Sequence, residues 1–194
     1  MIRGTKAVVL LLAICAACSG DTRGMKAAPA SAATSDARPA RTLDACLLLL
    51  KPDVDAAFAP RTFALEPATQ PDIASSGKLA AVSTCTFVSR GASIREMLTV
   101  SLLARRAPTD ASGVTVATAK AGAAQLKATP VDVPGLGDAA YWVNLGSASR
   151  PSIQLNVFKG PRVWLVFGAS TAGMDAHATV EHLTTLAHAA LIRL

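Results

Sequence analysis

An uncharged apolar run near the start of the chain, residues 7–17, determines which part of the chain is left to fold. Arg3 and Lys6 make the segment before it positive, and the run is well short of the ~20 residues that a membrane-spanning helix needs. A positive start, a short apolar core and small residues after it are typical of a secretory signal peptide. We therefore expect residues 1–17 to be removed on export, so that the fold forms from residues 18–194.

Cys18 comes directly after this run, behind the small residues Ala16 and Ala17. The arrangement resembles the signal of bacterial lipoproteins, in which the cysteine is acylated and becomes the first residue. That resemblance implies that Cys18 is the lipid attachment site; two or three acyl chains hold a protein on a membrane, since each buried methylene contributes ~0.8 kcal/mol. The family pattern usually has Leu where this chain has Cys15. Ser19 in place of Asp favours the outer membrane, facing the periplasm, in a cell that has one.

Two other interpretations of the Cys15–Cys18 pair stay open. A C-x-x-C redox or metal site belongs at the start of a helix that comes after a strand, whereas this pair lies inside an export signal. A plain cleaved signal would leave Cys18 as a free thiol. We favour acylation, with Cys15 lost together with the signal.

Residues 19–42 have the composition of a tether. Ala, Ser, Thr, Pro, Gly and charged residues dominate, and Met25 is the only sizeable apolar side chain. Such a segment cannot bury enough apolar surface to offset its ordering entropy. We expect a disordered linker, stiffened by Pro29 and Pro39, that holds the domain on the order of 25 Å from the lipid. The globular part is then residues 43–194, which suits one domain with its own core.

The number and distribution of charged residues indicate which classes of partner to expect. The net charge of +6 includes Arg3 and Lys6, and the other basic residues are scattered, with Arg105-Arg106 as the only doublet. No stripe of Lys and Arg interleaved with aromatic residues is present, so we do not expect nucleic-acid binding. Weak attraction to anionic lipid or to a cell-wall polymer fits this charge.

Two cysteines remain in the domain, Cys46 and Cys85. An even pair in an exported chain indicates one disulfide. Closing a loop of about 40 residues would stabilise the fold by roughly 4 kcal/mol in the chain-entropy description. Two buried free thiols are the alternative.

Apolar periodicity predicts helices and strands that alternate in groups. Helices are expected over residues 43–51, 53–59, about 112–126 and 178–194; strands are expected near residues 62–66, 80–89, 96–105, 139–144, 152–158 and 163–168. Thr42 is the expected cap of the first helix, and Asp110 or Ser112 that of the third. Short links between neighbouring strands make the sheet antiparallel. We predict a single α+β domain, with five to six antiparallel strands, helices packed on one face and one disulfide.

One segment near the C-terminus partly matches a serine-hydrolase motif. Residues 168–173, GASTAG, approach the G-x-S-x-G turn around Ser170, and Asp175 and His188 come next in the hydrolase order. The second Gly falls one residue late, and that enzyme fold needs a parallel sheet and a longer chain. We interpret Ser170 as a turn residue at the end of a strand.

Two further patterns fall short of a ligand site. His177 and His182 are five residues apart on a predicted helix with Glu181 between them, so their side chains diverge by about 140°. Gly135 and Gly137 lack the further glycines and the helix that a phosphate loop requires. We expect solvated helix residues and a Pro-Gly turn, and no metal or cofactor.

Most of the aromatic residues lie in one stretch. Tyr141, Trp142, Phe158, Trp164 and Phe167 fall on neighbouring predicted strands. Core burial is the favoured interpretation, because aromatic side chains dominate core packing. If Trp142 and Trp164 shared the outer face of the sheet, they would form a binding patch together with Tyr141.

Several short motifs together resemble a group of small bacterial lipoproteins of unknown function. The matching motifs are D-x-C-x-L-L at 44–49, a short Pro-started helix at 52–58, C-T-F at 85–87, G-L-G-D-x-A-Y-W at 135–142, V-x-K-G at 157–160 and L-A-x-x-A-L-x-R-L at 186–194. The resemblance spans most of residues 43–194. It implies a disulfide, turns and helix ends, and brings no catalytic residues.

These observations favour a lipid-anchored envelope protein whose domain binds or scaffolds without catalysis. An envelope protein or a cell-wall polymer is the expected partner beside the membrane itself. Two alternatives remain: a carrier of a small apolar ligand or lipid, and a hydrolase that uses Ser170.

Overall fold

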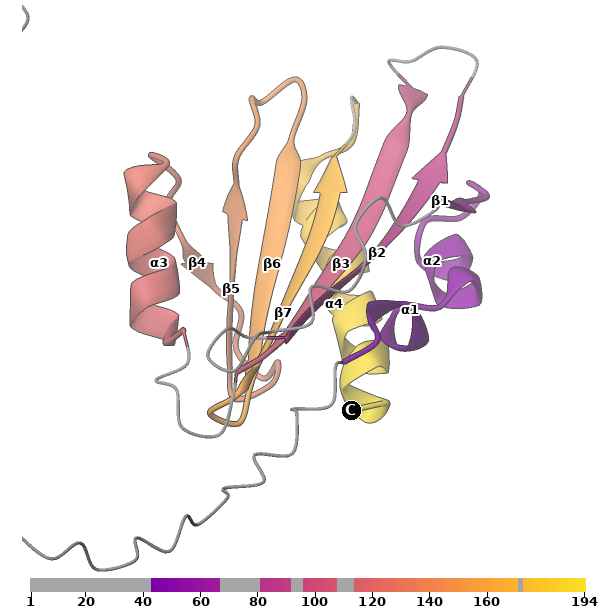
Figure 1. The fold of residues 1–194 in the computed structure, drawn as a ribbon. Coiled ribbons are helices and arrows are strands. Elements are labelled where there is room, and N and C mark those ends of the chain that lie inside the picture. The colour runs from indigo at the N-terminus through magenta and orange to yellow at the C-terminus, as the bar shows by residue number, and fades with distance from the viewer. Residues whose placement is uncertain (1–42, 67–80, 92–95, 108–113, 171–172) are drawn as a thin grey trace, which may run out of the picture. The chain divides into compact units, whose positions relative to one another are not determined.

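The computed structural model describes residues 43–66, 81–91, 96–107, 114–170 and 173–194. They belong to one compact unit, Arg38–Leu194. Their elements, in chain order, are α1 (Ala45–Leu48), α2 (Lys51–Ala57), β1 (Ala64–Glu66), β2 (Ala81–Ser89), β3 (Leu98–Arg106), α3 (Val116–Gln125), β4 (Val131–Asp132), β5 (Ala139–Asn144), β6 (Ser152–Lys159), β7 (Val163–Ser170) and α4 (Ala176–Ile192). The predicted α+β class is confirmed (Figure 1).

The strands form one antiparallel sheet in the order β1-β2-β3-β7-β6-β5-β4. The expected pairings of β2 with β3 and of β6 with β7 are both present. The described residues hold seven strands rather than the predicted five to six. The strand that was not predicted is β4 at one edge of the sheet, which has only two residues, whereas the short edge strand β1 falls within the predicted strand at 62–66. Strands this short are hard to recognise from alternation.

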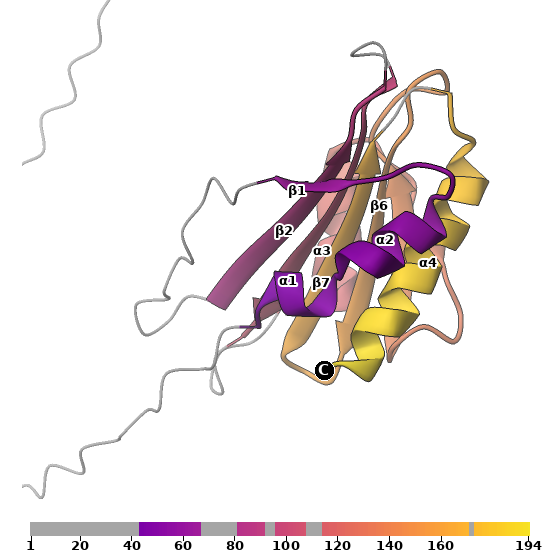
Figure 2. The ribbon, with the colours of Figure 1, turned by 90° about the vertical axis from the view of Figure 1, so that its right-hand side faces the viewer.

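The first face of the sheet carries the main core, and α1, α2 and α4 cover it (Figure 2). Leu102, Leu155 and Leu165, from three adjacent strands, have no exposed surface. Leu183 and Ala187 of α4 are equally buried against them. An amphipathic helix that lays its apolar stripe on the apolar face of a sheet removes both from water, which is the main stabilising term of such a domain.

The second face of the sheet carries a smaller cluster under α3. Ala123 of that helix packs with Tyr141, Val143 and Phe158 of the sheet. The prediction that the helices pack on one face is therefore wrong for α3. The physical reason is that strand alternation also places aromatic side chains on the second face, and these need cover that a small, Ala-rich helix can give.

Side-chain caps begin three of the helices. Asp44 caps α1 by accepting from the Cys46 N–H at 2.9 Å, and Thr115 caps α3 by accepting from Thr118. Asp175 caps α4. The predicted caps Thr42, Asp110 and Ser112 lie outside the described residues. Each observed cap satisfies backbone donors that the first helical turn leaves without partners.

A disulfide joins α1 to the sheet. Cys46 and Cys85 are bonded with a Cα–Cα distance of 5.0 Å, which confirms the predicted pair. Ala45 also donates its N–H to the Ser83 hydroxyl at 3.1 Å. The short helix α1 is thus tied to β2 by a covalent bond and a hydrogen bond.

Candidate functional site

The three residues of the expected aromatic patch lie on different faces of the sheet. Trp142 is opposite Leu155, on the first face, where the ring of His177 meets it edge-on at 5.6 Å. Tyr141 and Trp164 lie on the second face. Because consecutive residues of a strand point to opposite faces, Tyr141 and Trp142 cannot share a patch. The condition set for the patch, that the two tryptophans share a face, is not met.

On the second face, three rings form an aromatic row across β7, β6 and β5. Trp164 and Phe158 stack with centroids 5.8 Å apart and planes 6° apart, and Phe158 lies 6.3 Å from Tyr141. A cation stands at each end. Arg105 lies 5.7 Å from the Trp164 centroid, and Lys120 lies 5.7 Å from that of Tyr141. These distances are within the range of cation–π attraction.

The aromatic row is held from within the sheet. The Trp164 indole N–H donates to the Asn156 Oδ1 at 3.2 Å, and Asn156 is buried beneath it. Tyr141 is also buried, and this burial raises the pKa of its phenol because the charged form would lose water. The face of Trp164 is shared between Phe158 and Arg105. Tyr141 and Phe158 are buried, so Trp164, which is half-buried, is the one ring of the row that reaches water.

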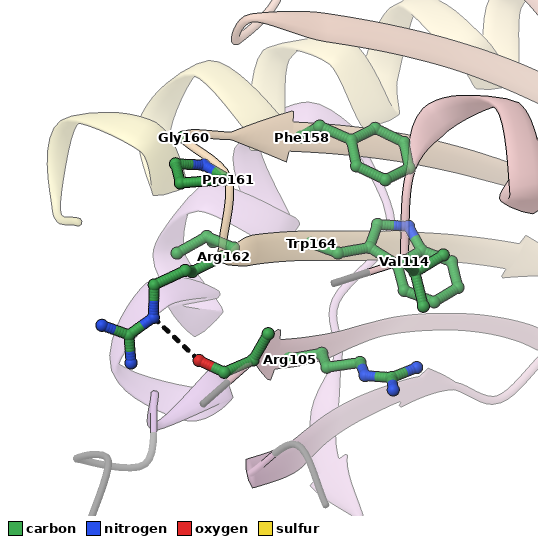
Figure 3. Close-up of a pocket in the computed structure, with 9 residues that line it drawn as sticks. Arg105, Val114, Phe158, Gly160, Pro161, Arg162 and Trp164 are labelled. Atoms are coloured by element: carbon green, nitrogen blue, oxygen red, sulfur yellow. Dashed lines mark hydrogen bonds between the residues drawn. The ribbon is translucent and has the colours of Figure 1, made fainter. Parts of the chain in front are cut away.

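A small recess opens beside Trp164 (Figure 3). Its volume is about 20 Å³, room for about one water. Arg162, at its rim, donates from Nε to the carbonyl oxygen of Ala107 at 2.9 Å. The guanidinium groups of Arg105 and Arg162 point in different directions (Figure 3). The recess therefore presents positive charge outward rather than enclosing a ligand.

The β6–β7 hairpin next to this recess is fixed by one carboxylate. Asp138 accepts from the Lys159 ammonium at 3.0 Å and from the Gly160 N–H at 2.6 Å. The bond to Lys159, with that to Gly160 second, holds the pKa of Asp138 below its ordinary value. Gly137 has φ +62°, and a Cβ there would lie 2.5 Å from the Phe158 carbonyl oxygen. Only glycine fits this close approach without a shift of the backbone.

The structure does not bring the hydrolase candidates together. Ser170 ends β7 and is exposed. Asp175 accepts from the backbone N–H groups of His177 and Ala178, and these bonds, that to Ala178 first, lower its pKa. His188 lies thirteen residues further along α4, roughly 20 Å along the axis from Asp175. Asp175 therefore serves as a helix cap and does not orient His188.

The two other histidines of α4 face different aromatic neighbours. His177 meets Trp142, whereas the ring of His182 lies 4.8 Å from that of Phe58. Within the described ranges, no group of three His, Cys, Asp or Glu side chains could hold a metal ion. The side chains of His177 and His182 therefore diverge on α4, as their five-residue spacing predicts.

The fold also gathers basic residues that looked scattered in the sequence. The register pairs Arg105 with Trp164 and Arg106 with Val163, the residue next to Arg162. Lys159 pairs with Val163 from the other side. We call Arg105, Arg106, Lys159 and Arg162 the basic cluster. The signal that could have found it is the antiparallel register, which brings the end of one strand beside the hairpin of two others.

The proposed acylation site, Cys18, lies outside the described residues. In the part of the chain that the structure describes, no helix has the length and apolar character to cross a membrane.

Comparison with known proteins gives no relative: the chain matches no family model, no curated protein and no solved structure.

Proposed function

We propose that this chain is an exported lipoprotein, acylated at Cys18, whose domain is a non-enzymatic binding or scaffold module of the cell envelope. The observation that carries the proposal is the Cys46–Cys85 disulfide. Disulfides persist in oxidising compartments outside the cytosol, which is where the N-terminal signal would send the chain. The motifs shared with small bacterial lipoproteins of unknown function support the same class.

Asp175, the acidic residue of the hydrolase pattern, has a structural role instead, because it caps α4. On the second face of the sheet, half-buried Trp164 with Arg105 over its ring is the part of the aromatic row that a partner could contact. An envelope protein or a cell-wall polymer is the proposed partner.

Metabolic labelling with an alkyne analogue of palmitate tests the anchor. Cells that express the full chain should label it, and a Cys18→Ala variant should lose the label. Cys15→Ala is the matched control, since it removes the neighbouring thiol and should leave labelling unchanged. Labelling that survives in the Cys18→Ala chain, or that is missing from the unaltered chain, contradicts acylation at Cys18.

Crosslinking in living cells tests the scaffold role. One envelope protein or polymer should be recovered repeatedly with the anchored chain and lost with the Cys18→Ala variant. A specific catalytic activity that disappears when one polar residue is changed would instead point to an enzyme, and labelling of Ser170 by a fluorophosphonate would assign it.

A hollow beside β1 makes a carrier of small apolar ligands the second candidate. Its volume is about 480 Å³, and it is lined by apolar Phe63, Leu65 and Val88 as well as by polar Thr62, Glu66 and Arg90. That volume falls within the range of small-molecule sites. Native mass spectrometry of the purified chain should then show a bound lipid or other apolar ligand. A Val88→Asp variant should lose the ligand, whereas the same change at exposed Leu126 should not.

A further inference from the structure

The strand β1 lies at the outer edge of the sheet (Figure 1). Among the described strands it pairs with β2 alone, so its other side has no strand beside it. All three residues of β1 are exposed, and Leu65, which is opposite buried Phe87, is 53% exposed. An edge of this kind presents backbone N–H and C=O groups to which a further strand can be added.

The hollow of about 480 Å³ lies along this same strand. Ala64 lines it together with Val88, the residue directly opposite on β2, so the two side chains share the second face of the sheet. Thr62 and Glu66, two positions before and after Ala64, also line the hollow. Residues two apart on a strand point to one face. The small methyl group of Ala64, between two larger side chains, therefore leaves room for an apolar side chain from outside.

Opposite charges line the two ends of the hollow. Glu66 lies where β1 finishes, and Arg90, two positions beyond Val88, lies toward the start of β1 because the two strands run antiparallel. Among the described residues, neither side chain has a hydrogen bond or an ion-pair partner. Both charges are therefore available to a ligand.

The positive end keeps an excess of positive charge over its described surroundings. Arg61 lies near it and donates to the Glu96 carbonyl oxygen at 2.9 Å, and Glu96 itself lies beside Gly91, the residue after Arg90. Two arginines thus stand against one carboxylate at this end. An acidic group of a ligand is attracted there, and a basic group is attracted to Glu66.

We propose that an extended peptide segment of an envelope protein adds to β1 as an antiparallel strand. Its apolar residue lies over Ala64, a basic residue two positions earlier faces Glu66, and an acidic residue two positions later faces Arg90. The proposal rests on the proposed function, because it gives the site and the chemistry of the partner that a scaffold role requires. All the described strand pairs are antiparallel, so an antiparallel addition continues the sheet. A fatty acid would use Arg90 and the apolar wall but would leave Glu66 without a counterpart.

The length of β1 decides how such a peptide is selected. In strand addition the main-chain hydrogen bonds supply affinity and the side-chain pockets supply specificity. Only alternate residues of an antiparallel strand direct their N–H and C=O groups to a given side, so the three residues of β1 offer about two to four hydrogen bonds. So few bonds hold a peptide weakly, and the two ion pairs therefore decide which peptide binds.

Fluorescence anisotropy with two labelled peptides tests the proposal. The full chain is extracted in detergent from the membranes of expressing cells and titrated with TKTVTET, which has the proposed charge order, or with TETVTKT, in which the charges are exchanged. Both peptides have blocked ends, so that terminal charges do not contribute. The first peptide should bind, and the second should bind more weakly.

Charge exchange in the protein should reverse this preference. Arg90→Glu should weaken the binding of TKTVTET by at least about fivefold, the upper effect of one exposed ion pair. A Glu66→Lys, Arg90→Glu chain should instead prefer TETVTKT, which a merely structural role of these residues would not produce. The matched control is Arg150→Glu, an equal change at an exposed arginine outside the hollow, and it should have no effect.

Two further changes separate strand addition from binding in the hollow alone. Ala64→Trp fills the hollow and should abolish the binding of TKTVTET, and far-ultraviolet circular dichroism reports any loss of fold. N-methylation of one alternate set of peptide residues should also abolish binding, whereas methylation of the other set should not, because only one set donates to β1. Equal effects of the two sets would contradict strand addition.

The outcomes also separate this proposal from the scaffold role. Equal binding of the two peptides, or binding of neither, overturns strand addition at β1. If crosslinking in cells then recovers the same envelope partner with the unaltered and the Arg90→Glu chains, the scaffold role stands and its site lies elsewhere. If decanoate binds in place of the peptides and Arg90→Glu abolishes its binding, strand addition is overturned and the hollow belongs to the carrier candidate.

Discussion

The two faces of the sheet are built from the same strands and differ in what they hold. On β7, Leu165 and Phe167 point into the first face and have no exposed surface, whereas Trp164 and Val166 point to the second face and are half-buried. Three helices cover the first face, and α3 covers part of the second. The first face is therefore closed to water, whereas the second face leaves Trp164 partly open beside Arg105.

The largest expected effect compares two aromatic residues of β7. Phe167→Ala should lower the free energy of unfolding by about 4 kcal/mol, because it opens a cavity in the closed first face. Trp164→Ala should cost roughly half as much, since its site is already half open to water. Urea denaturation measures both. Equal losses would mean that the two faces contribute alike to stability.

The next effect concerns the Cys46–Cys85 disulfide, which holds α1 on the first face. A Cys46→Ser, Cys85→Ser chain should lose roughly 4 kcal/mol, as the 39-residue separation of the two cysteines implies in the chain-entropy description. Part of the loss reflects a less constrained unfolded chain rather than weaker packing. Cys18→Ser is the control, because it removes a cysteine outside this pair. A double variant as stable as the unaltered domain would contradict a stabilising role for the bond.

The sequence predicted the first face better than the second. Alternation placed Cys85 and Phe87 on one side of β2, and the structure confirms both as buried. The disulfide could be inferred from the cysteine count and the export signal. Periodicity could not show that α3 lies on the other face, because its apolar residues are mainly alanines that give no strong stripe.

The basic cluster was hidden for a different reason. Arg105 and Arg162 are 57 positions apart, and only the register of β3 with β7 makes them neighbours. The aromatic patch is absent for a reason that was visible in the sequence. Tyr141 and Trp142 are consecutive residues of one strand, so their side chains point to opposite faces. Long-range register is the information that local patterns lack.

The third prediction uses the only tyrosine of the chain, Tyr141. Burial raises its pKa, so the folded state holds its proton where the unfolded state releases it. The stabilisation is complete below the unfolded pKa of about 10 and is lost as the pH rises through the folded pKa. Absorbance at the phenolate band should therefore titrate later in native protein than in urea. Coincident titrations would show that the second face does not shelter this ring.

The smallest effect concerns the β6–β7 hairpin. The lowered pKa of Asp138 means that its contribution to stability is present above the unfolded pKa of about 4 and is lost as the pH falls through the folded pKa. Asp138→Asn should therefore be slightly less stable at neutral pH, and the gap should close in acid. Glu181→Gln on exposed α4 surface is the control. A difference in stability between the two chains that stays constant with pH would mean that the charged form of Asp138 does not stabilise the fold.

The intact mass of the chain recovered from cell membranes tests the anchored, disulfide-bonded state most directly. We expect a polypeptide that begins at Cys18, with the added mass of two or three acyl chains and with Cys46 and Cys85 oxidised. A chain that begins elsewhere, or that begins at Cys18 with an unmodified thiol, would contradict the anchor on which the proposed function depends.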